Sequence, residues 1–422
     1  MSAIATPCRG VAVSLTSLPL EADSRAFRAA CGLAEAGFRS IVIEGRRSEE
    51  RFWGEAVEVV SPGPVSAGAG SPLRRAASTL RDGQFGVIGE AALYAAFRGY
   101  DWWRRRQPQS IAFPDADLYY LHSFEMHRLV ALRAARLGAR IVYDAHDFYR
   151  GIDPRERQRS FDRNRLRPFF NRLEDRLVAE ADAVITVSDG IATLMEATFG
   201  RRPVVIRNCH DVRYDQPGRS DLRQAIGLTA EDCLAVVVGN CKLGMAVMAA
   251  CDAMALLPER FHLAFVGRGY EKVAGEIGRH PAAHRVHLGH CVAPNRVVPF
   301  IAAADLGLVL YEPYSENYRY ALPNGFFQVV AAGLPVIRGH LPEIEAAVGG
   351  REVGVCLDVI EAAGLAAAIA RGAEEAARLR PAVATLAHEL RWETEAVRLR
   401  RLVESVCGEH EAPAPALAPA AK

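Results

Sequence analysis

The sequence lacks the features that mark several classes of protein. Its nine cysteines include no Cys-x-x-Cys pair, and this odd, scattered set predicts reduced thiols in a cytoplasmic protein rather than a disulfide framework. Lys and Arg number 51 against 50 Asp and Glu, so the basic excess typical of nucleic-acid binding is absent and we expect no nucleic-acid partner. No uncharged apolar stretch reaches the length of a membrane span, and MSAIATPCRGVAVSL has no charged region leading into a long apolar one, so we expect no signal peptide.

Two nucleotide-binding signatures are also missing. The glycine-containing stretches VVVGNCKLG (236–244) and FVGRG (265–269) contain neither Gly-x-Gly-x-x-Gly nor the P-loop pattern Gly-x4-Gly-Lys-Ser/Thr. Dinucleotide-dependent dehydrogenases and P-loop enzymes are therefore disfavoured.

What is present is a long series of short apolar segments that alternate with helical ones. A chain of 422 residues, 50% hydrophobic and 24% charged, predicts a globular protein with two domains. Strands are expected at 10–15, 40–45, 57–63, 117–122, 140–146, 182–188 and 202–208, and in a second series at 233–240, 262–269, 285–290, 305–311 and 334–339. Such apolar strands between helices predict two α/β domains, each a doubly wound parallel sheet covered on both faces. A helix opened by Asp23 and Ser24 is the first of these crossovers.

Polar and low-complexity stretches divide the chain. NCHDVRYDQPGRSDLRQ (208–224) is polar and turn-rich and predicts an interdomain linker, while EAPAPALAPAAK at the end predicts a disordered tail. The segment 74–106 mixes arginines with aromatic residues. It is either a packed helix with a solvated basic face or an amphipathic helix in peripheral contact with an anionic membrane surface.

Several residues at expected strand ends have the chemistry to bind phosphate or sugar. The loop in ALPNGFFQVV (321–330) opens a helix whose free backbone N–H groups suit an anion, although a plain turn is the simpler interpretation. Lys242 and Arg268 follow two successive strands and are either phosphate ligands or solvated surface cations. His146, in VYDAHDFY, is either a sugar or phosphate ligand or a helix-capping residue, and His122 is its analogue one strand earlier.

Two patterns that resemble metal sites are weak. Asp-Ala-Asp at 115–117 precedes its strand, so it lies at the wrong end of a sheet for a ligand site. The histidines of 280–290 alternate faces along a strand and would not converge on one ion. We expect no metal in the functional site.

Several motifs, in order over most of the chain, resemble a retaining glycosyltransferase of the GT-B fold, similar to glycosyltransferase family 4. They are RLEDRLVAEADAVITVSDGIATLM (172–195), PVVIRNCHD, the 236–313 core of the second series, YALPNGFFQVVAAGLPVI and the terminal RWETEAVRLRRLVESV. The resemblance implies two Rossmann-like domains facing across a cleft: 1–212 on the acceptor side, 213–385 binding a nucleotide-sugar donor, a helix at 386–408 crossing back, and a tail at 409–422.

The resemblance also implies roles for individual residues. His146 would contact the donor sugar as the catalytic residue. The hydroxyl acceptor (a sugar, a lipid-linked glycan or a small molecule) would bind near Ser17, Leu18 and His122. No cofactor is implied, and the helix dipole and basic side chains would replace a metal ion at the leaving diphosphate. The donor would be bound by Gly239, Asn240, Lys242, Gly267, Arg268, Tyr320, Ala321, Leu322, Pro323, Asn324, Gly325 and Gln328.

The chain departs from the family pattern at several of these positions. Gln328 stands where a ribose-binding Glu is usual, Tyr320 where another Glu is frequent, and Gly325 where a Lys is common. Asn240 leaves Lys242 as one charge of a usual basic pair, and TSLPLEADSR (16–25) lacks a frequent Gly-Gly. Two alternatives therefore stay open: an inactive homologue that binds a partner, and a sugar-nucleotide epimerase.

Overall fold

The computed structural model describes residues 9–49, 51, 53, 57–61, 114–152 and 167–408. The chain divides into two compact units. The first unit comprises Met1–Ala145, Arg165–Ile185 and Ala396–Lys422, and the second comprises His146–Asn164 and Thr186–Glu395.

A seven-stranded sheet of the order β3-β2-β1-β4-β5-β6-β7 contains the first series of strands. Its paired strands run parallel where their registers are recorded, for example Val13 opposite Ile41 and Tyr119. The strands are β1 (Val11–Leu15), β2 (Arg39–Ile43), β3 (Glu58–Val60), β4 (Leu118–Leu121), β5 (Arg140–Asp144), β6 (Ala183–Thr186) and β7 (Val204–Val205). Among the described residues, the helices of the first unit are α1 (Ser24–Glu35), α4 (His127–Leu137), α6 (Arg167–Glu180) and the part of α17 (Trp392–Cys407) from Ala396 on.

Local sequence explains the start of α1. The Asp23 side chain accepts a hydrogen bond from the Ala26 N–H, which satisfies one of the N–H groups left free at a helix start. The Thr16 hydroxyl donates to the same carboxylate at 2.6 Å, so the turn after β1 and the start of α1 are joined. The predicted helix opened by Asp23 and Ser24 is confirmed.

The second unit is built on a six-stranded parallel sheet of the order β10-β9-β8-β11-β12-β13. Its strands are β8 (Cys233–Val238), β9 (Phe261–Val266), β10 (Val286–His290), β11 (Leu306–Val309), β12 (Val336–Gly339) and β13 (Gly354–Leu357). The helices of this unit are α7 (Asp189–Phe199), α8 (Leu222–Ile226), α9 (Val247–Leu256), α10 (Ala274–Ile277), α11 (Val297–Ile301), α12 (Glu316–Arg319), α13 (Asn324–Ala331), α14 (Pro342–Val348), α15 (Ala362–Glu374) and α16 (Ala376–Glu389).

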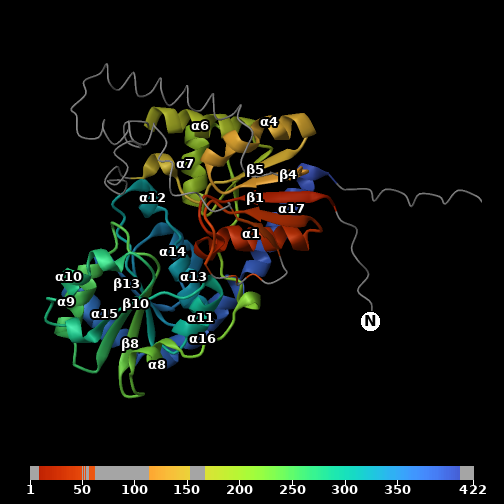
Figure 1. Ribbon diagram of the computed structural model, residues 1–422. Helices are drawn as coiled ribbons and strands as arrows, with labels where there is room; N and C mark the ends of the chain where they lie inside the picture. The colour runs from red at the N-terminus through yellow and green to blue at the C-terminus, as the bar shows by residue number, and fades with distance from the viewer. Residues whose placement is uncertain are drawn as a thin grey trace, which may run out of the picture. The chain divides into compact units, whose positions relative to one another are not determined.

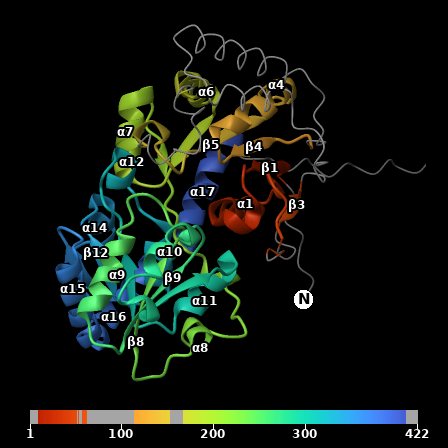
Figure 2. The ribbon, with the colours of Figure 1, turned by 60° about the vertical axis from the view of Figure 1, so that its left-hand side comes forward.

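Helices cover both faces of this second sheet. Alternate residues of β8 point to opposite faces, so Val237 packs with α9 and α15, whereas Val236 packs with α11, α13, α14 and α16. Figure 1 shows α9 and α15 on one side of the strands and α11 and α13 on the other, and Figure 2 keeps α9 and α15 together after rotation. All residues of β8 are buried, which is why its sequence is uniformly apolar.

The predicted α/β class with parallel sheets is confirmed, and each expected strand segment contains a strand. One strand was missed, β13, at the edge of the second sheet. Its sequence Gly-Val-Cys-Leu is short, only partly buried and begins with a glycine, a residue that is uncommon in strands.

The remaining expectations concern the domain boundaries, the 74–106 segment and the C-terminal tail. The boundaries 1–212, 213–385 and 386–408 stay predictions, although α16 and α17 occupy the expected terminal helical region. The 74–106 segment and the 409–422 tail lie outside the described residues. Within the described ranges, no helix combines the length and apolarity needed to cross a membrane.

Candidate functional site

Glycines bring two loops of the second unit into backbone contact at the carboxyl ends of β8 and β9. Gly239 and Gly267 have φ values of 129° and 154°, which residues with a side chain rarely adopt. A Cβ atom added to Gly267 would lie 2.1 Å from the Gly239 carbonyl oxygen. The Tyr270 hydroxyl donates to that same carbonyl at 3.0 Å. The loops can meet this closely because Gly267 lacks a side chain, whereas a Cβ atom on Gly239 would meet only the Tyr311 hydroxyl, at 3.8 Å.

The side chain of Asn240 joins the two loops further. Its carbonyl oxygen accepts from the Arg268 backbone N–H at 2.9 Å, and Cys241 N–H donates to the Arg268 carbonyl at 2.8 Å. Asn240, Lys242 and Arg268 are all exposed. The loops thus present two cationic side chains from a joined backbone.

Helix α13 begins directly beside the end of β8. Pro323 precedes its first residue, and a Cβ atom on Gly325 would lie 2.3 Å from the carbonyl oxygen of Val238. Any side chain at 325 would therefore push the helix away from the strand. The close approach places the start of α13 at the edge of the sheet where Gly239 turns. The Phe326 N–H donates to the Pro323 carbonyl at 3.0 Å, and the N–H groups of Asn324 and Gly325 precede that bond at the positive end of the helix dipole.

Asn324 and Gln328 lie on this helix. The Asn208 amide donates a hydrogen bond to the Asn324 side-chain oxygen, which joins the Ile-Arg-Asn-Cys-His-Asp motif to the start of α13. Gln328 is half-buried one turn further on, and Leu322 is buried before the helix begins. Ala321 and Pro323 are half-buried.

Tyr320 packs against the start of α7. A Cβ atom on Gly190 would lie 2.1 Å from the Tyr320 ring, and the Ser188 hydroxyl donates to the Tyr320 carbonyl at 2.9 Å. Glu343 accepts from the N–H groups of Gly190 and Asp189, at 2.7 and 3.2 Å. These contacts hold the residues just before the 321–325 loop.

The segment that contains His146 belongs to this same unit. Phe148 N–H donates to the Asn317 side-chain oxygen at 2.8 Å, and the Asn317 amide donates to Asp147 at 3.2 Å. Burial raises the pKa of the Tyr311 phenol, Lys242 opposes that rise, and Asp147 adds to it. Lys242 and Asp147 both act electrostatically on this phenol, so the predicted phosphate ligand and the residue after His146 are both near Tyr311.

The predicted acceptor-side residues lie in the first unit and differ in exposure. Ser17 and Leu18 are exposed in the turn after β1, where Gly45 N–H donates to the Leu18 carbonyl. His122 is 2% exposed, and its Nδ1 lies 3.7 Å from a carboxylate oxygen of Asp144. The same carboxylate is paired with Arg25 at 2.7 Å.

The two patterns that resembled metal sites have other partners. Asp117 accepts from the Val11 N–H at 2.8 Å, and Asp115 pairs with Arg133 at 2.7 Å. The histidines of 280–290 point to different places: His280 contacts Asp252, His284 contacts Glu259, and His287 contacts His262. Neither set gathers ligand atoms around one point.

Sequence reasoning missed Tyr311, Asn317 and Asn208. Tyr311 had a detectable signal, because it directly follows the apolar segment Asp-Leu-Gly-Leu-Val-Leu at an expected strand end. Asn208 lies within the motif PVVIRNCHD, but the sequence predicted no partner for its side chain. Asn317 had no signal, because its contacts join positions about 170 residues apart in the chain.

Taken together, the carboxyl edge of the second sheet has the N-terminus of α13, a close contact between the Gly239 and Gly267 loops, and exposed cations. Backbone N–H groups at a helix start and side-chain cations both stabilise oxyanions.

Comparisons with known proteins agree with this fold. Residues 24–214 match the model described as Glycosyltransferase Family 4. No curated protein matches the chain. Sucrose-phosphate synthase from Thermosynechococcus elongatus is similar in structure, with a TM-score of 0.65 and 17% identity over 94% of this chain and 99% of that one.

Two further solved structures are similar over nearly their whole length. Anabaena HepE in complex with UDP-glucose has a TM-score of 0.64 and 17% identity over 94% of this chain and 100% of that one. WaaG, a glycosyltransferase involved in lipopolysaccharide biosynthesis, has a TM-score of 0.59 and 14% identity over the same shares.

The two parallel-sheet units and the structural similarities define the GT-B fold, as the sequence predicted. The resemblance to glycosyltransferase family 4 is confirmed by the family model, which covers residues 24–214.

Proposed function

We propose that the protein is a retaining glycosyltransferase that moves a sugar from a nucleotide-sugar donor to a hydroxyl acceptor in the synthesis of a glycan, polysaccharide or glycoconjugate. The main support for this proposal is that α13 packs closely against β8 at Gly325. That contact brings the N-terminus of α13 to the strand edge that also carries Gly239 and Lys242.

The donor would bind through its diphosphate to this edge. The N–H groups of the first turn of α13 and the ammonium of Lys242 would stabilise the negative charge that develops on the leaving diphosphate. Gln328, one turn into the helix, would accept from a ribose hydroxyl through its amide oxygen. His146 would contact the donor sugar, and Asn317 would hold the two residues that follow it. This chemistry uses no metal ion.

The chain departs from the family pattern at Gly325 and at Gln328, and the two differences have different effects on the site. Glycine at 325 has a structural reason, because a lysine side chain there would meet the Val238 carbonyl. Glutamine at 328 retains a hydrogen-bond acceptor but lacks the charge of the usual glutamate. The proposal therefore expects weaker donor binding than a glutamate would provide.

Release of nucleoside diphosphate tests the proposal. We expect the purified protein with EDTA to release the diphosphate from one member of a nucleotide-sugar panel that begins with UDP-glucose, which the HepE structure contains. Release should accelerate with the right acceptor, and NMR of the product should show the anomeric configuration of the donor. Sugar nucleotide that is bound and never cleaved would instead indicate an inactive homologue, and conversion to an isomeric sugar nucleotide would indicate an epimerase.

Lys242 provides the variant for the same assay. Lys242→Ala removes one charge-assisted contact, which is expected to cost about 1.5–3 kcal/mol, or roughly one to two decades in affinity for the diphosphate. Arg219→Ala is the control, because Arg219 is an exposed cation in the polar 208–224 segment. Equal affinity of Lys242→Ala and the control would remove Lys242 from the site.

A further inference from the structure

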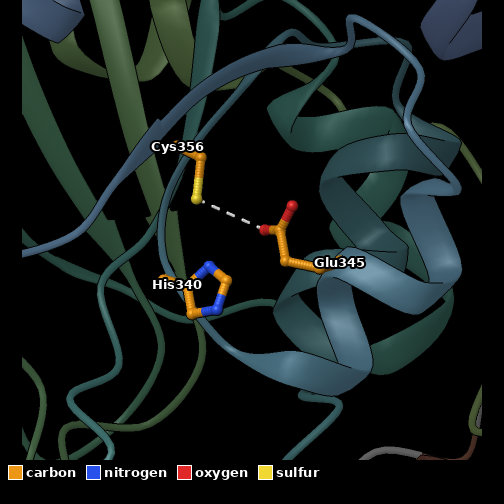
Figure 3. Close-up of side chains that lie close together, drawn as sticks. All are labelled: His340, Glu345 and Cys356. Atoms are coloured by element: carbon orange, nitrogen blue, oxygen red, sulfur yellow. Dashed lines mark hydrogen bonds between the residues drawn. The ribbon is translucent and has the colours of Figure 1, made fainter.

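Three side chains with different metal-binding atoms meet at the edge of the second sheet. His340 follows β12, Glu345 lies on α14, and Cys356 lies on β13. Their ligand atoms lie within 4.8 Å of one another, and this is the one such group of His, Cys, Asp and Glu found among the described residues. Figure 3 shows the thiol, the carboxylate and the imidazole gathered around one space.

The spacing suits a small tetrahedral ion. The Cys356 Sγ lies 3.3 Å from a Glu345 carboxylate oxygen and donates a hydrogen bond to it. Zinc binds thiolate sulfur at about 2.3 Å and carboxylate oxygen at about 2.0–2.2 Å, so two such ligands of one tetrahedral ion lie about 3.5 Å apart. Replacing the shared proton with zinc would therefore need little movement of either side chain.

Glu345 is already oriented for this role by Arg338. The buried Arg338 guanidinium donates to both carboxylate oxygens, at 2.8 Å each. Each oxygen keeps a second lone pair, and Cys356 uses one of these. Carboxylates that bind metals are themselves hydrogen-bonded in this way, which fixes their orientation.

We propose that His340, Glu345 and Cys356 form a zinc site, with a water molecule as the fourth ligand, that connects the edge strand β13 to the β12–α14 connection. A thiolate, an imidazole and a carboxylate together favour zinc over magnesium or calcium, which prefer oxygen ligands alone. The ligands are separate from the predicted donor-binding residues. The zinc would brace the short edge strand, and the metal independence proposed for sugar transfer is unaffected.

The thiol must lose its proton to bind the ion. Partial desolvation of the thiol, together with the neighbouring Glu345 and Asp358, raises the pKa of Cys356 to about 11, while Arg338 opposes the rise. A thiol that is protonated at neutral pH remains a ligand, because metal binding itself drives deprotonation.

Titration of the full chain with Co²⁺ tests the site. The protein is first treated with a chelator that is then removed. We expect one equivalent of Co²⁺ to bind with a thiolate-to-cobalt charge-transfer absorption band, and one equivalent of Zn²⁺ to abolish that band. Cys356→Ser should lose the band. His340→Ala should weaken binding by at least the roughly 10–100-fold that loss of an outer-shell partner causes.

Matched controls separate this site from other thiols and imidazoles. Cys291 is also an exposed cysteine and His284 an exposed histidine, so Cys291→Ser and His284→Ala should keep the band and the affinity. Glu345 is not substituted, because it also pairs with Arg338. Circular dichroism confirms that each variant is folded. No band in the wild type, a band that persists in Cys356→Ser, or unchanged affinity in His340→Ala overturns the proposal.

Discussion

At the scale of single residues, the best-defined question is what His146 does. It is half-buried, and the two residues after it are held by Asn317 through hydrogen bonds to Asp147 and to the Phe148 N–H. Such an anchored neighbour positions a side chain without itself touching the substrate. The same geometry is compatible with a histidine that only supports the local turn.

A kinetic comparison distinguishes these two roles. His146→Ala is expected to lower kcat with the full nucleotide-sugar far more than it weakens binding of the bare diphosphate, because the sugar contact is made only when the sugar is present. His284→Ala, an exposed histidine that contacts Glu259, is the control. If His146→Ala lowers the melting temperature and leaves kcat at the control value, the residue has a structural role.

At the scale of elements, the contact between α13 and β8 determines where the helix begins in space. Gly325→Ala would place a Cβ atom 2.3 Å from the Val238 carbonyl oxygen, so the helix must move outward. We expect a loss of about 1–3 kcal/mol in the free energy of unfolding, as for other overpacked sites, together with weaker diphosphate binding.

A second helical glycine provides the control for that substitution. Gly275, in α10, has no atom within 4 Å of an added Cβ. Gly275→Ala should leave diphosphate affinity unchanged and keep or slightly raise stability, since alanine is the better helix former by roughly 1 kcal/mol. If the two variants have the same stability and the same affinity for the diphosphate, the close contact between α13 and β8 does not have the role that we propose.

The edge of the same sheet contains a pair of histidines whose charge state depends on pH. Nδ1 of His262 on β9 lies 3.1 Å from Nε2 of His287 on β10. A carboxylate oxygen of Asp232 lies 3.8 Å from Nε2 of His262. Burial, with His262 and His290 nearby, lowers the pKa of His287 to about 4.

This shift predicts a loss of stability in acid. A histidine in the unfolded chain has a pKa of about 6.5, so between pH 6.5 and about 4 the unfolded state binds more protons than the folded state. The contribution is fully present above pH 6.5 and is lost as pH falls, by at most about 1.4 kcal/mol per pH unit. Urea unfolding at pH 7, 6 and 5 should show a shallower decline in His287→Gln than in the wild type. The exposed control His284→Gln should follow the wild type, and identical slopes in all three proteins would refute this origin of the pH dependence.

At the scale of the whole molecule, the predicted donor ligands and His146 fall in one of the two units, and Ser17, Leu18 and His122 fall in the other. A diphosphate alone should therefore act on one unit. By mass action, a ligand at 100 times its Kd stabilises the state that binds it by about 2.7 kcal/mol.

Hydrogen exchange with and without UDP measures this selectivity. We expect slower exchange in 238–244 and 320–328 and unchanged exchange in β1 and β4. Lys242→Ala at the same UDP concentration should show weaker protection. Equal protection of both units would mean that the diphosphate does not bind where we propose.

Much of this protein could be read from the sequence because its parallel strands are buried on both faces. The fully apolar β8 and the Asp23 cap of α1 are local features, and each was predicted from its own residues. Gly239, Gly267 and the Pro-Asn-Gly loop were recognisable as turn residues next to apolar segments.

Other features depend on contacts between distant parts of the chain and had no local signal. Asn208 with Asn324, Asn317 with Asp147, and the seating of Gly325 on Val238 each join positions that only folding brings together. The edge strand β13 was not predicted because it is short and begins with Gly354, and glycine is uncommon in strands. Its thiol, with His340 and Glu345, forms a ligand set only once β12, α14 and β13 pack side by side, because three separate segments each supply one atom.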